Sequence, residues 1–295
     1  MQKNKPLFKK AFSLIELSIV SLVIMSLLVG VPQGVRLVRN FKISVAKTQT
    51  QSSPVAGIKN LALWLEATAE NSFGGSGPEN NSGVQTWVDT SPQAVSRFSA
   101  VQNNTLKQPT YLSDGINGLP ALKFDGADDD MAMAGFSAGS NTSYFFVVQP
   151  AAAQVEAIFD SAPNQPQVFR NLCDEPNYPT CTGDGAFSWW TGTNPTPQVT
   201  LGLAANAPYV IYVETKLSPS RVINYYRNGV FVSTSSHAST TNTTWNNPKI
   251  GSVNDTLKFY NGKIGEIIVF DRTLQTEERN SIADYLGKKW GIKVF

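Results

Sequence analysis

The chain has 295 residues and a formal net charge of +2, but its charges are unevenly distributed. All but one of its 22 acidic residues lie after residue 59, and this acidic part argues against nucleic acid as a partner, because phosphate contacts need clustered cations. The single histidine argues against histidine-based triads and multi-histidine metal sites.

The N-terminal segment combines a basic leader with an apolar run. Residues 1–11 hold four lysines and no acidic residue, and residues 12–31 are apolar or small except for Glu16. Twenty helical residues extend about 30 Å, which matches the hydrocarbon core of a bilayer. A carboxylate inside such a helix costs roughly 2.5–3.5 kcal/mol on insertion scales, so it usually has a partner. The run therefore predicts a transmembrane helix in which Glu16 has a specific role.

The start of this run matches a known pattern. Lys9-Lys10-Ala11 followed by Phe12-Ser13-Leu14-Ile15-Glu16 resembles the N-terminus of type IV prepilins and type II secretion pseudopilins. The resemblance implies that residues 1–11 are a leader peptide, which prepilin peptidase removes between Ala11 and Phe12 before N-methylation of Phe12. It also implies that residues 12–45 form a transmembrane and assembly helix. Glu16 would neutralise the N-terminal amine of a neighbouring pilin or pseudopilin subunit.

Other interpretations of the N-terminus explain less. The family prefers glycine before the cleaved bond, so Ala11 is a departure for which we expect slower cleavage. A secretory signal peptide would end in an A-x-A-like site, and residues 27–34 contain none. A simple membrane anchor would account for the apolar run and would leave Glu16 unexplained.

The rest of the chain has the pattern of a β-protein. Residues 46–58 are mostly small or polar and predict a linker. In residues 59–295, short apolar runs alternate with Gly, Asn, Ser and Pro clusters, as is typical of strands. The predicted strand regions are 61–67, 120–126, 143–150, 209–216, 222–235 and 262–272.

Two local signals define the turns and helices of this part. Asn228-Gly229, between two alternating runs, predicts a hairpin with a type I′ turn. One helix is predicted from Thr276, as its N-cap, to about Leu286. Ile282, Leu286 and Trp290 recur at four-residue spacing and are expected to bury one face of it.

Three segments resemble concanavalin A-like, laminin-G-like domains. They are LALWLEA at 61–67 with Trp87 and Asp89 after it, INGLPALKFDGADD at 116–129, and the closing strand and helix at 262–292. The resemblance implies a mainly β chain, in which a pilin-type transmembrane helix precedes a concanavalin A-like β-sandwich (jelly roll) at 59–295 with one C-terminal helix. A different β-sandwich is the alternative.

The acidic residues do not form a recognisable glycosidase motif. Domains of the resembling class include glycan binders, calcium-dependent protein binders and glycosidases, and glycosidases need a pair of carboxylates at a set separation. Glu214 and Glu266 are single acidic residues in their strands and are expected to face solvent. We therefore predict no enzymatic activity and no cofactor.

A cluster of four aspartates has two interpretations. Asp125, Asp128, Asp129 and Asp130 offer oxygen ligands of the kind that calcium prefers. The same segment also has the composition of a turn between two strands, with Gly126 at a positive φ. The sequence leaves both a calcium site and a structural turn open.

The aromatic residues divide into core and candidate binding residues. Trp64, Trp87 and Trp290 lie in apolar patterns and are predicted to be core. Trp189-Trp190 and Tyr225-Tyr226 are adjacent pairs, so in a strand one member of each pair is expected to face outward. Such outward rings would stack on a sugar or pack against a neighbouring subunit.

The two cysteines flank a proline-containing segment. Cys173 and Cys181 are predicted to form a disulfide in an oxidising compartment. The alternative of two free thiols fits an exported domain poorly.

Together these expectations describe a minor pilin or pseudopilin, processed by prepilin peptidase and assembled with other pilin or pseudopilin subunits. A single N-terminal helix would hold it in the bacterial inner membrane, with its head in the periplasm or on an extracellular filament. The head would be lectin-like and bind a glycan or surface ligand. The alternative is a purely structural pseudopilin of a type II secretion-like system, without a ligand of its own.

Overall fold

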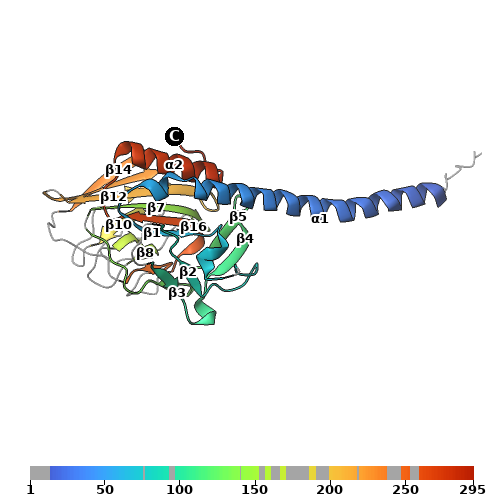
Figure 1. The fold of residues 1–295 in the computed structure, drawn as a ribbon, viewed down its shortest axis with the longest axis horizontal. Helices are drawn as coiled ribbons and strands as arrows, with labels where there is room; N and C mark the ends of the chain where they lie inside the picture. The colour runs from blue at the N-terminus through green and yellow to red at the C-terminus, as the bar shows by residue number, and fades with distance from the viewer. Residues whose placement is uncertain are drawn as a thin grey trace, which may run out of the picture. The chain divides into compact units, whose positions relative to one another are not determined.

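A computed structural model describes residues 14–75, 77–92, 97–139, 141–152, 157–160, 167–170, 186–190, 199–217, 219–237, 247–252 and 259–295. The chain divides into two compact units, Met1–Lys42 and Ile43–Phe295. The long helix α1 (Leu14–Gln51) begins in the first unit and ends in the second (Figure 1).

The described part of the first unit is helical throughout. The large apolar side chains described between Leu14 and Met25 are solvent-exposed, among them Leu14, Leu22 and Met25 at 85%, 69% and 68%. The prediction of an N-terminal helix is thus confirmed. Within the described residues, none of the helices has both the length and the apolar character needed to cross a membrane.

The second unit is built on two antiparallel sheets (Figure 1). The first sheet has, in spatial order, β14 (Val230–His237), β13 (Arg221–Arg227), β12 (Tyr209–Leu217), β7 (Thr142–Pro150), β16 (Asn261–Phe270), β5 (Leu119–Asp125) and β4 (Thr110–Ile116), with β1 (Leu61–Glu66) also paired to β16. The second has β11 (Val199–Thr200), β10 (Ala186–Trp190), β9 (Gln167–Arg170), β8 (Ala157–Asp160), β15 (Lys249–Ile250), β6 (Met131–Ala132), β3 (Ser99–Val101) and β2 (Thr86–Val88). The remaining helices are η1 (Pro54–Gly57), η2 (Glu70–Phe73), η3 (Thr105–Lys107) and α2 (Thr276–Trp290).

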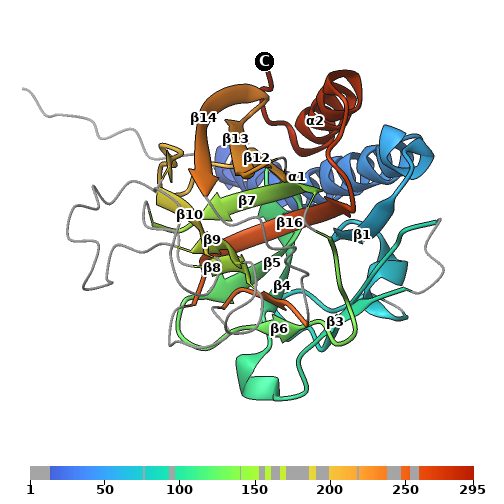
Figure 2. The same ribbon diagram turned by 90° about the vertical axis from the view of Figure 1, so that its left-hand side faces the viewer.

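Both faces of the first sheet are buried, which creates two hydrophobic cores. In β7, Tyr144 and Phe146 contribute to the core between the sheets, while Phe145 and Val147 contribute to the core on the opposite face. This second core lies between the sheet and α2, which is seen above the sheet in Figure 2. Burial on both faces explains why β7 is an almost uninterrupted apolar run instead of an alternating one. The predicted β-sandwich with one C-terminal helix is therefore confirmed.

Strand β16 changes its pairing partner in mid-course. On one side it pairs with β7 along its length, and on the other it pairs first with β5 and then with β1. The change occurs at Gly265, where the register with β7 also shifts. A Cβ atom at Gly265 would collide with the indole ring of Trp290, so glycine lets α2 approach this strand closely.

Several local predictions agree with the structure. Asn228 and Gly229 have φ values of 50° and 81°, as the type I′ turn between β13 and β14 requires. Ile282, Leu286 and Trp290 are fully buried on one face of α2. The N-cap of that helix is Gln275, one residue before the predicted Thr276, because Gln275 and Glu278 form a reciprocal capping box.

The prediction of a linker at residues 46–58 is wrong, because much of this segment is helical and packs against the domain. Helix α1 continues to Gln51, past the expected end at residue 45, and η1 follows at Pro54. Ala46 and Val55 are both buried in the core beneath α2. Small side chains here allow close packing, which composition alone does not distinguish from flexibility.

Candidate functional site

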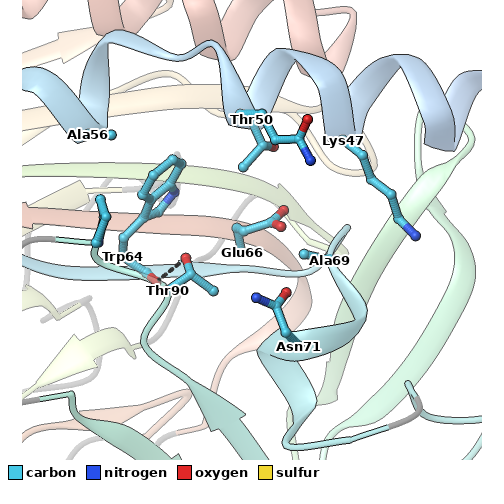
Figure 3. Close-up of a pocket in the computed structure, with 10 residues that line it drawn as sticks. Lys47, Thr50, Ala56, Trp64, Glu66, Ala69, Asn71 and Thr90 are labelled. Carbon is cyan, nitrogen blue, oxygen red and sulfur yellow. Dashed lines mark hydrogen bonds between the residues drawn. The ribbon is translucent and has the colours of Figure 1, made fainter.

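A cavity of about 420 Å³ lies between the last turns of α1, strand β1 and the loops that follow it (Figure 3). All of its walls belong to the second unit. It is lined by Lys47, Thr50, Gln51, Ala56, Trp64, Glu66, Ala69, Asn71, Thr90 and Pro92. Its volume falls within the range typical of small-molecule sites.

Behind this cavity is a buried cluster of two carboxylates and one ammonium group. Glu66 and Glu266 are directly opposite each other in the β1–β16 ladder. Lys289, from the last turn of α2, donates to Glu66 Oε2 and to Glu266 Oε2, each at 2.9 Å. The three side chains are almost completely shielded from solvent. Like charges opposite each other destabilise a ladder, so Lys289 is what makes this pairing tolerable.

Every oxygen of the Glu266 carboxylate has donors. Oε1 accepts from Trp64 Nε1 at 2.8 Å and from the Tyr285 hydroxyl at 2.9 Å. Oε2 accepts from Trp290 Nε1 at 2.8 Å in addition to Lys289. Four donors converging on one carboxylate identify it as an ionised, acceptor-only group. The prediction that Glu266 faces solvent is therefore wrong.

The Glu66 carboxylate is bonded asymmetrically. Oε2 accepts from the backbone N–H of Thr68 at 2.9 Å, from its hydroxyl, and from Lys289. Oε1 is buried and has no hydrogen-bond donor among the described residues. Burial by itself would raise the pKa of the Glu66 carboxyl, but Lys289 and Thr68 outweigh it and hold this pKa below its ordinary value. Glu66 thus presents an ionised side chain to the cavity.

The ammonium group is stabilised by the same contacts. Burial alone would lower the pKa of Lys289, but the charges of Glu266 and Glu66 reverse that effect and raise it. Lys289 therefore stays protonated throughout the physiological range. With two carboxylates and one ammonium group, the cluster carries one uncompensated negative charge.

The sequence contains a pattern that indicates this cluster, and our predictions did not use it. Glu66 ends one apolar strand and Glu266 interrupts another, and both strands are buried on both faces. Charged residues are almost never fully buried unless paired. The cation is 223 residues from Glu66 and 23 from Glu266, so neither spacing suggests the contact.

The aspartate cluster is divided by the structure. Asp125, Asp128 and Asp129 bring carboxylate oxygens within 4.8 Å of one another. Asp130 is directed elsewhere, where it pairs with Lys249 at 2.9 Å and accepts from Ser252 at 3.0 Å. Three oxygen donors suit a hard cation such as calcium, although calcium takes six to eight ligands in total.

The same segment is also a turn, as the alternative interpretation predicted. Gly126 has a φ of 79°. Asp125 Oδ1 accepts the backbone N–H of Ala127 at 2.8 Å and that of Asp128 at 3.2 Å. These bonds stabilise the charged form and lower the pKa of Asp125 against the opposing effect of burial. Burial, reinforced by the charge of Asp125, raises the pKa of Asp129 to about 6.

The tyrosine pair does not form a surface site. Tyr225 lies in the core between the sheets, and Tyr226 lies on the opposite face at 9% exposure. Arg279 of α2 stacks 4.6 Å from the centre of the Tyr226 ring and donates to its hydroxyl at 3.0 Å. The expected alternation is present, but the second face is covered by α2 and not by solvent. The prediction of an outward tyrosine for ligand stacking is therefore wrong.

The other predicted site residues can be placed only in part. Glu16 lies in the first turn of α1. Ala11, Phe12, Cys173 and Cys181 lie outside the described residues. Trp189 and Trp190 lie in strand β10, and their side chains are outside the described part of the structure.

Comparisons with known proteins concern the fold alone. No family model matches the chain, and no curated protein matches its sequence. The binding domain of botulinum neurotoxin serotype D aligns with a TM-score of 0.51 and 12% identity, over 79% of this chain and 52% of that chain. At this identity the likeness shows the fold alone, and it agrees with the predicted β-sandwich.

Two further solved structures align more weakly. Trypanosoma rangeli sialidase has a TM-score of 0.47 and 12% identity, over 79% of this chain and 33% of that chain. The botulinum neurotoxin serotype D ligand-binding domain in complex with N-acetylneuraminic acid has a TM-score of 0.48 and 13% identity, over 81% of this chain and 56% of that chain. This chain thus spans between a third and just over half of the structures it resembles.

Replacing Lys289 tests the buried cluster. Lys289→Met leaves Glu66 and Glu266 facing each other without a cation, so we expect the free energy of unfolding to fall by about 3–5 kcal/mol. Lys288→Met is the matched control, because Lys288 pairs with Asp284 at the exposed surface and its loss should cost about 0.5 kcal/mol or less. Chemical denaturation of both variants measures this difference. Equal losses would contradict the role of Lys289.

The raised pKa of Asp129 predicts a pH dependence of stability. The folded pKa of about 6 exceeds the ordinary aspartate value of 3.8, so the folded state binds this proton more tightly than the unfolded state does. The domain should therefore gain stability from Asp129 as the pH falls from about 7 to 4. Asp129→Asn should raise the free energy of unfolding at pH 7 by on the order of 1–2 kcal/mol. It should also remove the part of the increase in stability at low pH that comes from Asp129. Urea unfolding at pH 7 and pH 4 measures this pH dependence, with the exposed Asp114→Asn variant as control. If Asp129→Asn has the same dependence of stability on pH as the wild type, the prediction is refuted.

Proposed function

We propose that this chain is a pilin-type subunit with a displayed binding head. Its N-terminal helix, from residue 12 to 45, would be inserted in the bacterial inner membrane and would join a filament after processing by prepilin peptidase. The β-sandwich would be displayed in the periplasm or on a filament outside the cell. Its bulk favours a minor position in the filament.

The observation that carries this proposal is the exposed apolar surface of α1. Large apolar side chains from Leu14 to Met25 are exposed around the whole circumference of the helix, and they continue at Val35, Leu37, Val38 and Phe41. A helix that is apolar on all sides is stable only when it is buried in a larger helical assembly or in lipid. Soluble monomers rarely expose contiguous apolar patches of this kind.

Glu16 supplies the specificity that an apolar surface lacks. It is the acidic residue of the first turn of α1 and the single carboxylate before residue 60. Cleavage between Ala11 and Phe12 would create a new amine four residues away. A pair between Glu16 and the amine of a neighbouring subunit would relieve two desolvation penalties together, which selects one register of assembly.

A binding role for the head is the second part of the proposal. It is supported by the fold likeness to a neurotoxin binding domain and by the Asp125, Asp128 and Asp129 group, which would hold a calcium ion near a glycan or surface ligand. We propose binding over hydrolysis, since the buried carboxylates Glu66 and Glu266, which oppose each other in the β1–β16 ladder, are both engaged by Lys289. A structural pseudopilin without a ligand is the alternative, because a fold does not determine a function.

Glu16→Ala tests the assembly role. We expect normal removal of residues 1–11 and at least a tenfold lower amount of the protein in sheared filaments, because the neighbour's amine would lose its counter-charge. Intact mass of the membrane fraction and immunoblots of the filament fraction measure the two effects. The exposed head variant Glu79→Ala is the control. Wild-type incorporation of Glu16→Ala would refute this role of Glu16.

A glycan array tests the head. The full chain in detergent should bind one class of glycans in the presence of calcium, and chelation or Asp128→Asn should reduce that signal at least tenfold. Asp114→Asn, at an exposed position away from the cluster, should bind like the wild type. Failure to bind any glycan with or without calcium would contradict glycan binding and favour the structural pseudopilin.

A further inference from the structure

The cavity beside Glu66 contains an acceptor that the described protein atoms leave unsatisfied. The Glu66 side chain is fully buried, and its Oε2 is engaged by Thr68 and Lys289. Its Oε1 has no donor among the described residues, although the residue lines the cavity. A buried acceptor without a partner is energetically unfavourable, and more so when it is charged. An occupant of the cavity that donates a hydrogen bond would recover this energy.

The charge of the surroundings favours a cationic occupant. Glu66 and Glu266 share one ammonium group, that of Lys289, so one negative charge remains in a region shielded from water. At low local dielectric such a charge attracts a cation far more strongly than it would in bulk solvent. Lys47 also lines the cavity, and in Figure 3 its side chain extends away from the Glu66 carboxylate.

The remaining walls provide acceptors beside a small apolar surface. Thr50 of α1 and Asn71 of η2 lie on either side of the Glu66 carboxylate in Figure 3 and offer hydroxyl and amide oxygens. Ala69 and the edge of Trp64 supply the apolar part of the wall. A primary ammonium group has three N–H donors and no acceptor, which matches this set of oxygens.

We propose that this cavity binds a small primary ammonium compound, whose N–H groups donate to Glu66 Oε1 and to the oxygens of Thr50 and Asn71. The site takes either a free amine or the amino group of an amino sugar. It does not depend on filament assembly or on the calcium-linked glycan site proposed above. Failure of either of those roles leaves it intact.

Calorimetric titration of the full chain in detergent tests the proposal with four probes. Methylammonium should bind saturably with one site per chain, and tetramethylammonium, which carries the same charge without N–H donors, should bind at least tenfold more weakly. Glucosamine and glucose separate the two sources of the amine. Tighter binding of glucosamine than of methylammonium supports an amino sugar, and the reverse order supports a free amine.

Three variants and one control variant localise the binding. Glu66→Gln should weaken methylammonium binding at least tenfold, because it removes the charge and the free acceptor, whereas the exposed Glu79→Gln should change nothing. Ala69→Leu narrows the cavity without altering any charge and should also weaken binding at least tenfold. It keeps the test valid if Glu66→Gln folds poorly. Lys47→Gln removes a cation from the wall and should strengthen binding severalfold.

Specific results would overturn the proposal. They are the absence of saturable methylammonium binding, equal binding of tetramethylammonium, or equal binding of glucose and glucosamine. Unchanged affinity in a correctly folded Ala69→Leu variant would likewise show that the ammonium group binds elsewhere. Circular dichroism of each variant establishes that it is folded.

Discussion

The second unit depends on one contact, the placement of Lys289 between Glu66 and Glu266. The two carboxylates oppose each other across the β1–β16 ladder, and the lysine comes from the last turn of α2. Three elements from the two ends of the domain are thereby held in one register. A slip of one residue in β1 would direct Glu66 toward the opposite face and separate it from its cation. Apolar side chains in these positions would pack, but they would not distinguish one register from the next.

The same contact determines which carboxylate of the second unit is available to bind a ligand. Glu266 is fully occupied by four donors, so its carboxylate is structural. Glu66 shares the cation but keeps one oxygen without a donor among the described residues, and it lines the cavity at the end of α1. The structural cluster and the candidate site are therefore adjacent parts of one arrangement. The aspartate turn after β5 is separate, and its properties come from local backbone hydrogen bonds.

The sequence predicts what is encoded locally and misses what is encoded between distant residues. The Asn228-Gly229 turn and the buried stripe of α2 depend on neighbouring residues, and both are found as expected. The burial of Tyr226 and of Glu266 depends on α2 covering the sheet, which no periodicity within a strand reports. The cavity was missed for the same reason, because its walls come from four separate segments. The end of α1 was also misplaced, since small polar residues suit either a linker or a closely packed helix.

The position of β16 affects the order in which the domain can fold. It is the last strand in the sequence, yet it lies inside the first sheet and is the partner through which β1 joins that sheet. The first strand of the domain therefore stays unpaired in this sheet until nearly the whole chain has been synthesised. Pairings between such distant segments form slowly, because a long loop must close before any contact compensates for it. A domain with this connectivity can complete its first sheet only after its C-terminal strand is available.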